Sequence, residues 1–258
     1  MEKHQYEEQL VQLANEGKYN DLLTLAEKVV EEYPTWHIAW HYLAVAHGLL
    51  GNHEKAISYF IKVLEIKHQS TKALYGLSVS FHALKMYNEA ISCLLKHQEI
   101  NGPEYKISYG LGINYIEIGD LDKAIEALTQ ALELNPQSEE TMFCLADCYR
   151  LCAKYTMAIS LYERSLAIHA DNVSVIHNIA VCYKHLNDNE HAIEFYNKAL
   201  KIDPAFVRSL RNIVEIYVEI GQEKEAKQRI AEAFATQPNS TEIQELFDKQ
   251  NNLDKLIN

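Results

Sequence analysis

Hydrophobic and polar residues alternate along the chain at helical spacing. In GDLDKAIEALTQALELNP, residues 119–136, apolar residues recur every three or four positions between a Gly-Asp turn and a proline. This pattern predicts an amphipathic helix bounded by the turn and the proline. Similar stretches begin at Gly51, Asn187 and Gly221. We therefore expect one helical unit that is used many times.

The similar stretches define a repeat of constant length. Gly51 and Gly119 both open the pattern, and their positions in the chain differ by 68, which is twice 34. A frame with a period of 34 divides most of the chain without insertions. The seven predicted units are 3–36, 37–70, 71–104, 105–138, 139–172, 173–206 and 207–240.

Equivalent places in these units carry related residues. The twentieth place is mostly small: Leu22, Ala56, Ala90, Ala124, Ala158, Ala192 and Ala226. The eleventh place becomes aromatic: Leu13, His47, Phe81, Tyr115, Tyr149, Tyr183 and Tyr217. Four units close on proline: Pro34, Pro136, Pro204 and Pro238. Because small residues let helices approach and proline ends them, each unit is predicted to be two antiparallel helices.

The column pattern resembles the tetratricopeptide-repeat family across all seven units, or 238 of 258 residues. The resemblance implies an all-α fold, a right-handed α-solenoid of seven tandem helix-turn-helix repeats. It also implies that first helices line a concave groove and that the protein is an interaction scaffold. We expect a peptide or extended protein segment in the groove. The alternative is a structural scaffold whose repeats self-assemble into a homo-oligomer.

The two ends depart from the repeat. The first unit carries Glu7 and Glu8 where later units are apolar or small, which is typical of a capping repeat. Residues 241–258 are predicted to be a C-terminal capping helix and tail, with Ile243, Leu246 and Phe247 on one helical face. Asn239 with Glu242 predicts the capping box of that helix. The third unit closes on Gly102-Pro103. This junction is either tolerated drift or a hinge.

If the family geometry holds, the fifth place of each unit faces the groove. From the second unit to the sixth it is aromatic or imidazole throughout, namely His41, Tyr75, Tyr109, Phe143 and His177. These rings either contact a ligand or pack against the neighbouring first helix. Because the eleventh place already supplies core aromatics, we favour ligand contact.

Polar groove places complete the candidate site. We expect Lys72, Lys106, Arg150 and Lys184 to pair with ligand charges or carbonyl groups. Asn178 and Asn212 occupy matching places in consecutive units. They resemble part of the asparagine ladder of O-linked N-acetylglucosamine transferases, which implies contacts to ligand backbone; two such residues can also match by chance. The two-carboxylate clamp of co-chaperone members is absent, because Phe143 and Asp147 replace its Lys and Asn.

Charge and composition narrow the partner classes. The formal net charge is −12, which disfavours nucleic acid and anionic membranes. The start, MEKHQYEEQL, has no apolar stretch of the signal-peptide kind, so we expect a cytoplasmic protein without membrane insertion. The expected partner is a protein or peptide.

Catalytic and metal chemistry find little support in the sequence. The P-loop, HExxH and GxSxG patterns are missing, and the frame leaves only short turns for a catalytic site. Cys144, Cys148 and Cys152 are spaced one helical turn apart, which allows shared metal binding. We interpret them instead as small packing residues. The expectation is no enzyme, no cofactor and no metal.

Overall fold

The computed structural model describes residues 3–204 and 206–248. Within these ranges the chain is helical, with no strand. The helices are α1 (Lys3–Asn15), α2 (Tyr19–Glu32), α3 (His37–Leu49), α4 (His53–Ile66), α5 (Thr71–Ala83), α6 (Tyr87–Asn101), α7 (Tyr105–Glu117), α8 (Leu121–Leu134), α9 (Glu139–Leu151), α10 (Tyr155–Ile168), α11 (Val173–His185), α12 (Asn189–Ile202), α13 (Val207–Glu219) and α14 (Glu223–Thr236). Residues 241–248 are also helical, and the remainder of the expected tail, 249–258, lies outside the described residues.

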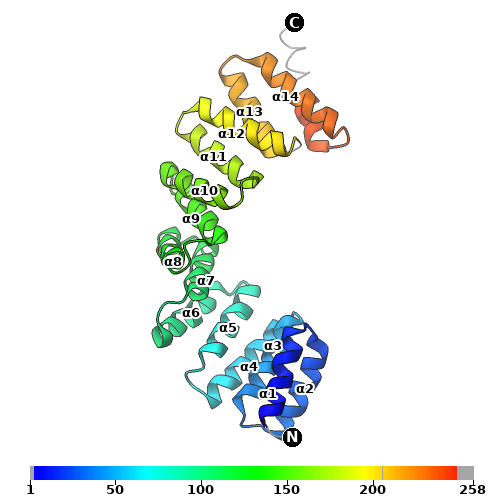
Figure 1. Cartoon of the computed structure of the whole chain (residues 1–258), viewed down its shortest axis with the longest axis vertical. Helices are drawn as coiled ribbons and strands as arrows, with labels where there is room; N and C mark the ends of the chain where they lie inside the picture. Colours follow the sequence, from blue (N-terminus) through cyan, green and yellow to red (C-terminus); the bar gives the residue numbers. More distant parts are fainter. Residues whose placement is uncertain (1–2, 205, 249–258) are drawn as a thin grey trace. The chain divides into compact units, whose positions relative to one another are not determined.

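The chain divides into two compact units, one up to Gln137 and one from Ser138 onward. Unit 1 contains α1 to α8, and unit 2 contains α9 to α14 with the helical residues 241–248. Within each unit, consecutive helices pack side by side (Figure 1). The odd-numbered helices begin at positions 3, 37, 71, 105, 139, 173 and 207, so the start advances by 34 from each to the next. The all-α solenoid of helix pairs is thus confirmed.

The turn inside each pair has one geometry throughout. At the same place in every pair the backbone has positive φ, and this place is glycine in Gly17, Gly51, Gly119 and Gly221. The next residue donates its N–H to a carbonyl five residues back, as Asp120 does to Tyr115 at 2.9 Å. This is a Schellman turn, which requires the left-handed conformation that glycine adopts most easily. Lys85, Ala153 and Asn187 adopt it with side chains, at φ of 61°, 57° and 60°.

Connections between pairs follow the expected capping. Pro34, Pro136 and Pro204 each lie two residues beyond the end of a second helix. The next first helix often begins with a side-chain cap: Ser138 Oγ accepts from the Thr141 N–H at 3.2 Å. The irregular junction at Gly102 ends α6 with φ of 79° and lies inside unit 1, away from the boundary between the units. The hinge alternative therefore does not coincide with that boundary.

Small residues set the close spacing within a pair. A Cβ atom at Gly112 of α7 would lie 2.5 Å from Leu128 Cγ of α8, so the two helices touch at a point where only glycine fits. A small residue at this place thus allows the two helices of a pair to approach closely, as the sequence predicted. Within each unit, a pair then packs against the next, as α2 does on α3 and α10 on α11, since no single pair can bury its own apolar face.

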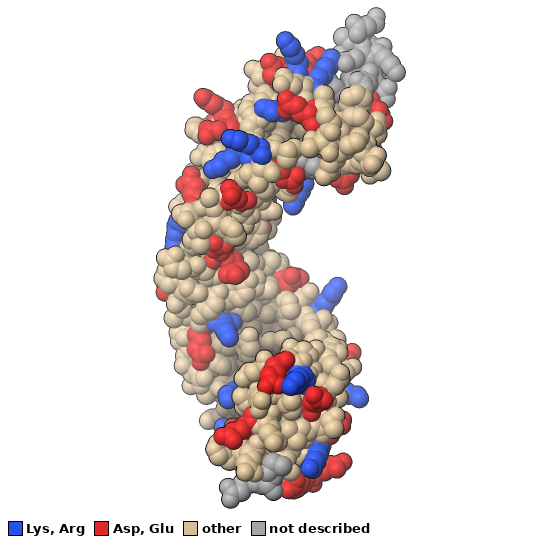
Figure 2. Space-filling model, turned by 45° about the vertical axis from the view of Figure 1, so that its right-hand side comes forward, with Lys and Arg blue, Asp and Glu red and all other residues tan. Residues whose placement is uncertain are grey.

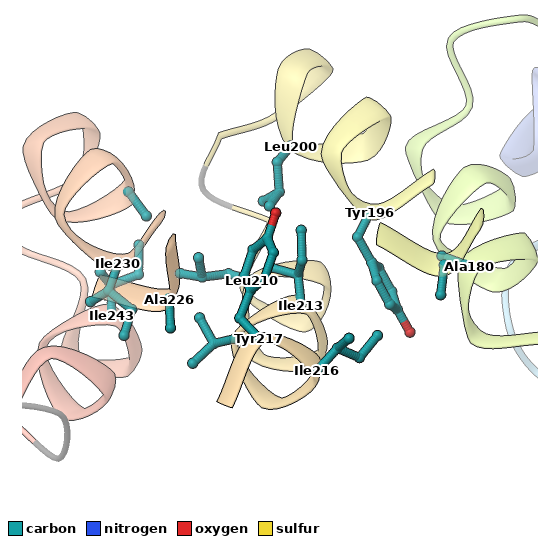
Figure 3. Close-up of a cluster of buried hydrophobic side chains, with 13 residues drawn as sticks. Ala180, Tyr196, Leu200, Leu210, Ile213, Ile216, Tyr217, Ala226, Ile230 and Ile243 are labelled. Carbon is teal, nitrogen blue, oxygen red and sulfur yellow. The ribbon is translucent and has the colours of Figure 1, made fainter. Parts of the chain in front are cut away.

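The C-terminal helical segment seals the core of unit 2. Ile243 is fully buried beside Ile230 of α14 (Figure 3). Phe247 stacks on Phe234 with ring centroids 5.0 Å apart. The capping role predicted for this segment agrees with these contacts. The predicted capping residue is wrong, because Ser240 rather than Asn239 accepts from the Ile243 N–H, at 3.4 Å.

Candidate functional site

The first helices of unit 1 lie side by side and form one of its faces, the first-helix face. α3 contacts both α1 and α5, so these three first helices are neighbours. Their shared face exposes apolar side chains: Val11 is 37 %, Tyr75 38 % and Val79 49 % exposed. On the face of the molecule in Figure 2, acidic and basic side chains intermingle. The first helices α1 and α5 therefore offer apolar surface to solvent.

A cavity of about 370 Å³ opens on this face between α3 and α5. We call it the α3–α5 pocket. Its lining includes His41 and Val45 of α3, Phe60 of α4, and Lys72, Tyr75 and Val79 of α5. Three residues predicted from the fifth and second repeat places, His41, Tyr75 and Lys72, thus meet in one pocket. Its volume and apolar lining are typical of a ligand pocket at the small end of the range.

The pocket owes its shape to one aromatic residue and one glycine. Phe60 is only 3 % exposed and its ring centroid lies 5.6 Å from that of His41. The ring lies so close to Gly76 of α5 that a Cβ there would be 2.6 Å from both Cε atoms and closer still to Cζ. Sequence reasoning missed both residues, since Phe60 lies on a second helix and Gly76 outside the groove places. The sequence did contain a signal for Phe60, because it is a large aromatic residue at a repeat place where the next two repeats carry Leu94 and Leu128.

The electrostatics of the pocket are those of a neutral cavity with a cation at one end. Burial, with help from Lys72 and His37, lowers the pKa of His41 to about 4, so the imidazole is uncharged at neutral pH. Lys72 is exposed and forms no ion pair with the described residues. A smaller cavity of about 250 Å³ adjoins it and is lined by Glu7, Lys67 and Lys72 among others.

The next first helix in unit 1, α7, carries Lys106 and Tyr109. Lys106 is exposed, and Tyr109 is half-buried with its ring stacked on Tyr105 at 6.1 Å. Neither lines the α3–α5 pocket. They occupy the same repeat places as Lys72 and Tyr75, one repeat further along the chain.

In unit 2, His177 is placed in the core and not on a groove surface. It is 6 % exposed, and its Nδ1 lies 2.9 Å from Ser209 Oγ. Its ring packs against Tyr196 and Phe206, with centroids 5.6 and 5.4 Å away. Burial first, then Arg208 and Arg150, lowers its pKa to about 4. We correct the expectation for His177, because the following helix covers its ring. Phe143 is half-buried, 6.0 Å from the Tyr162 ring.

The polar candidates of unit 2 have partners inside the chain. Asp147 Oδ1 accepts from Tyr162 Oη at 2.6 Å and from Arg150 Nε at 2.9 Å. Asn178 Nδ2 donates to Tyr162 Oη at 3.2 Å. Burial, and then the Asp147 carboxylate, raises the pKa of the Tyr162 phenol. Asn178 and Arg150 thus hold a buried tyrosine, which explains them without a ligand.

The two remaining candidates of unit 2, Lys184 and Asn212, also lie against other side chains of the chain. The Lys184 ammonium forms an ion pair with the Glu215 carboxylate. Asn212 is half-buried and lies beside the Tyr196 phenol, as Asn178 lies beside Tyr162 one repeat earlier. The matching places of the two asparagines follow from matching tyrosines on the preceding helices.

Two of the cysteines, Cys148 and Cys182, are buried as packing residues. Burial raises the pKa of Cys148 and of Cys182 to about 12, far from the range of reactive thiols. In residues 3–204 and 206–248, no group of three or more His, Cys, Asp or Glu side chains is arranged to hold a metal ion. Over the same ranges, no helix has the length and apolar character needed to cross a bilayer.

Sequence comparison decides the family. Models of the tetratricopeptide repeat match residues 105–138, 138–205 and 186–247, which together span 105–247, or 143 of 258 residues. The chain belongs to the tetratricopeptide-repeat family. Its N-terminal residues 15–97 match the model of anaphase-promoting complex, cyclosome, subunit 3. No curated protein matches the chain.

Solved structures agree with the tetratricopeptide fold. YrrB, described as a tetratricopeptide-repeat protein with an unusual peptide-binding site, is 23 % identical with a TM-score of 0.67, covering 72 % of this chain and 96 % of YrrB. The C-terminal part of a tetratricopeptide-repeat protein from Cytophaga hutchinsonii is 12 % identical with a TM-score of 0.81, covering 93 % of this chain and 98 % of that one.

The hetero-tetramer Cut9–Hcn1 of the anaphase-promoting complex supplies a third similar structure. Its matching chain is 19 % identical with a TM-score of 0.59, and the match covers 95 % of this chain and 48 % of that chain. At these identities the likeness shows the fold. The tetratricopeptide-repeat fold is in general that of a protein–protein interaction scaffold, and proteins with this fold are generally non-enzymatic.

Proposed function

We propose that this tetratricopeptide-repeat protein is an interaction scaffold that binds an extended peptide segment on the first-helix face of unit 1. The observation that carries the proposal is the α3–α5 pocket of about 370 Å³, lined by His41, Tyr75 and Lys72. Exposed aromatic and aliphatic side chains beside an open cavity are what a recognition surface uses, since they bury area at low entropic cost. The peptide-binding site that the description of YrrB mentions adds support by analogy of fold.

Lys106 and Tyr109 extend the proposed surface along α7. They repeat the lysine and tyrosine of α5 at the same places. In this proposal an extended ligand engages both repeats, whereas the polar candidates of unit 2 already have partners in the chain. We therefore centre the binding surface on unit 1, and Phe143 stays a half-buried candidate in unit 2.

Selection from a displayed library of random 12-residue peptides tests the proposal. The wild-type chain is expected to enrich peptides that a Tyr75→Ala, Tyr109→Ala double variant no longer binds. Loss of one central aromatic contact costs binding about 1–3 kcal/mol when that residue is a hot spot. Tyr87→Ala, an aromatic substitution on the second helix α6, is the matched control and is expected to keep the selected peptides.

Two results would contradict the proposal. The library yields no enriched peptide, or the double variant, with unchanged helical circular dichroism, binds the selected peptides as the wild type does. The self-assembly alternative and the cytoplasmic location stay predictions. A molecular mass that rises with protein concentration, measured by sedimentation, is the result that self-assembly requires.

A further inference from the structure

The α3–α5 pocket is long, apolar in its middle and charged at one end. Its α5 wall runs from Lys72 to Ser80, eight residue steps apart, which is about 12 Å along a helix. Between these ends the wall consists of Tyr75, Gly76 and Val79, and Val45 faces it from α3. An extended peptide covers such a length with about four residues.

The charged end is positive and has no partner in the described chain. The Lys72 ammonium is close enough to His41 to depress the pKa of its imidazole, which places this charge at the pocket. Glu7, Lys67 and Lys72 all line the adjoining cavity, so this end holds two lysines and one carboxylate. Since His41 is neutral, Lys72 is the cation that a ligand meets at this end.

We propose, resting on the proposed function, that the α3–α5 pocket selects partner segments in which a large apolar side chain lies next to an acidic side chain. The apolar side chain fills the space over Phe60 between Val45 and Val79. The neighbouring carboxylate pairs with Lys72. A basic residue at the same position is disfavoured by repulsion from Lys72, so the lysine selects against it as well as for an acid.

Acidic selection here is a local effect. The chain as a whole carries a formal net charge of −12, so its long-range field does not attract an acidic partner. The preference therefore depends on a direct contact at the pocket. Lys106, at the same repeat place on α7, offers a second carboxylate contact to a longer segment.

Defined peptides test this preference. The probes are acetyl-Ser-Gly-Leu-Glu-Gly-Ser-amide, its Leu-Lys counterpart and its Ala-Glu counterpart, titrated while methyl NMR signals of Val45 and Val79 are followed. The Leu-Glu probe is expected to move both signals. The Leu-Lys probe is expected to bind about threefold to fivefold more weakly, as for an exposed ion pair. The Ala-Glu probe is expected to bind about tenfold more weakly, because less apolar surface is buried.

Charge reversal gives the matched control. In Lys72→Glu, the Leu-Lys probe is expected to become the better ligand of the two. Lys96→Glu, the same change at an exposed lysine of the second helix α6, is expected to leave the order unchanged. Both sites are on the surface, so neither variant removes a core contact. An order that stays the same in Lys72→Glu overturns the proposal.

The outcomes separate this inference from the proposed function. If library peptides bind the first-helix face while the three probes bind equally or leave Val45 and Val79 unmoved, the preference is wrong and the function stands. If the library yields no peptide, the function itself fails. If a second copy of the chain occupies the pocket, the same methyl signals shift with protein concentration alone, which also overturns the proposal.

Discussion

Replacement of Gly76 by alanine tests whether Phe60 and this glycine shape the α3–α5 pocket. The new Cβ would stand 2.6 Å from both Cε atoms of the Phe60 ring. Carbon atoms prefer about 3.5–4.0 Å, so the ring has to retreat by about 1 Å or more. Phe60 packs in a core cluster with Ala44, Ala56 and Leu77. Because Phe60 also lines the pocket, we expect the ring to move into it.

The free energy of unfolding should register two opposed effects. Alanine is favoured over glycine inside a helix by about 1 kcal/mol, whereas overpacking a core costs about 1–3 kcal/mol. Gly76→Ala is therefore expected to be up to about 2 kcal/mol less stable than the wild type. Gly110→Ala, at the same repeat place on α7, brings a Cβ only to 3.2 Å from Leu94 Cδ1. This control is expected to lie between the wild-type stability and a gain of about 1 kcal/mol.

Thermal unfolding followed by circular dichroism measures the difference. For a chain of this size, 1 kcal/mol shifts Tm by about 2–4 °C, so the two variants should be separated by several degrees. Gly76→Ala is also expected to lose the selected peptides, because the displaced ring fills the pocket. A Tm for Gly76→Ala as high as that of Gly110→Ala would refute the reasoning, since it would mean that the ring does not touch Gly76.

Three further predictions concern stability. His41 and His177 have pKa values of about 4 in the folded chain, against about 6.5 in the unfolded chain. The free energy of unfolding is therefore expected to be constant above pH 6.5 and to fall by about 1.4 kcal/mol per pH unit per histidine between pH 6.5 and pH 4. The dependence of Tm on pH should be weaker in His177→Gln, and an unchanged dependence would contradict this. Asp147→Ala leaves Arg150 and Tyr162 without their shared acceptor and should cost about 1–3 kcal/mol in urea unfolding, against a smaller loss for the exposed Asp122→Ala; equal losses would count against the network. Ala153 has a φ of 57°, a left-handed conformation that strains alanine but not glycine, so Ala153→Gly should stabilise the chain by about 0.5–1 kcal/mol. Ala167→Gly, inside helix α10, should destabilise it. A change of the same sign in both variants would contradict this prediction.

The helices could be predicted from the sequence because every repeat uses the same local rules. Proline two residues after a helix and small residues at the contact of a pair are visible as columns of letters. The turn conformation was visible only in part. Gly51 and Gly119 indicate a left-handed turn in the sequence. Lys85 and Ala153 adopt the same left-handed conformation because the Schellman hydrogen bond and the flanking helices hold them there.

The site was harder to predict because a repeat column gives the face of a helix and not the neighbour that covers it. His41 and His177 share one column, yet His41 lines an open pocket while Phe206 and Ser209 cover His177. Asn178 looked like a ligand contact, but Tyr162 at a second-helix place supplies a phenol for it. The pocket itself depends on Phe60 and Gly76, a pair from different repeats whose sizes are complementary.

The central claim is that the first-helix face of unit 1 receives the ligand, and site-directed photocrosslinking tests it most directly. Val79 on the first helix α5 and Leu95 on the second helix α6 are 49 % and 47 % exposed, so each accepts benzoylphenylalanine at a matched site. With peptides from the library selection, crosslinks are expected from position 79 and not from position 95. Crosslinks from position 95 as strong as those from position 79, or from neither, would contradict the account.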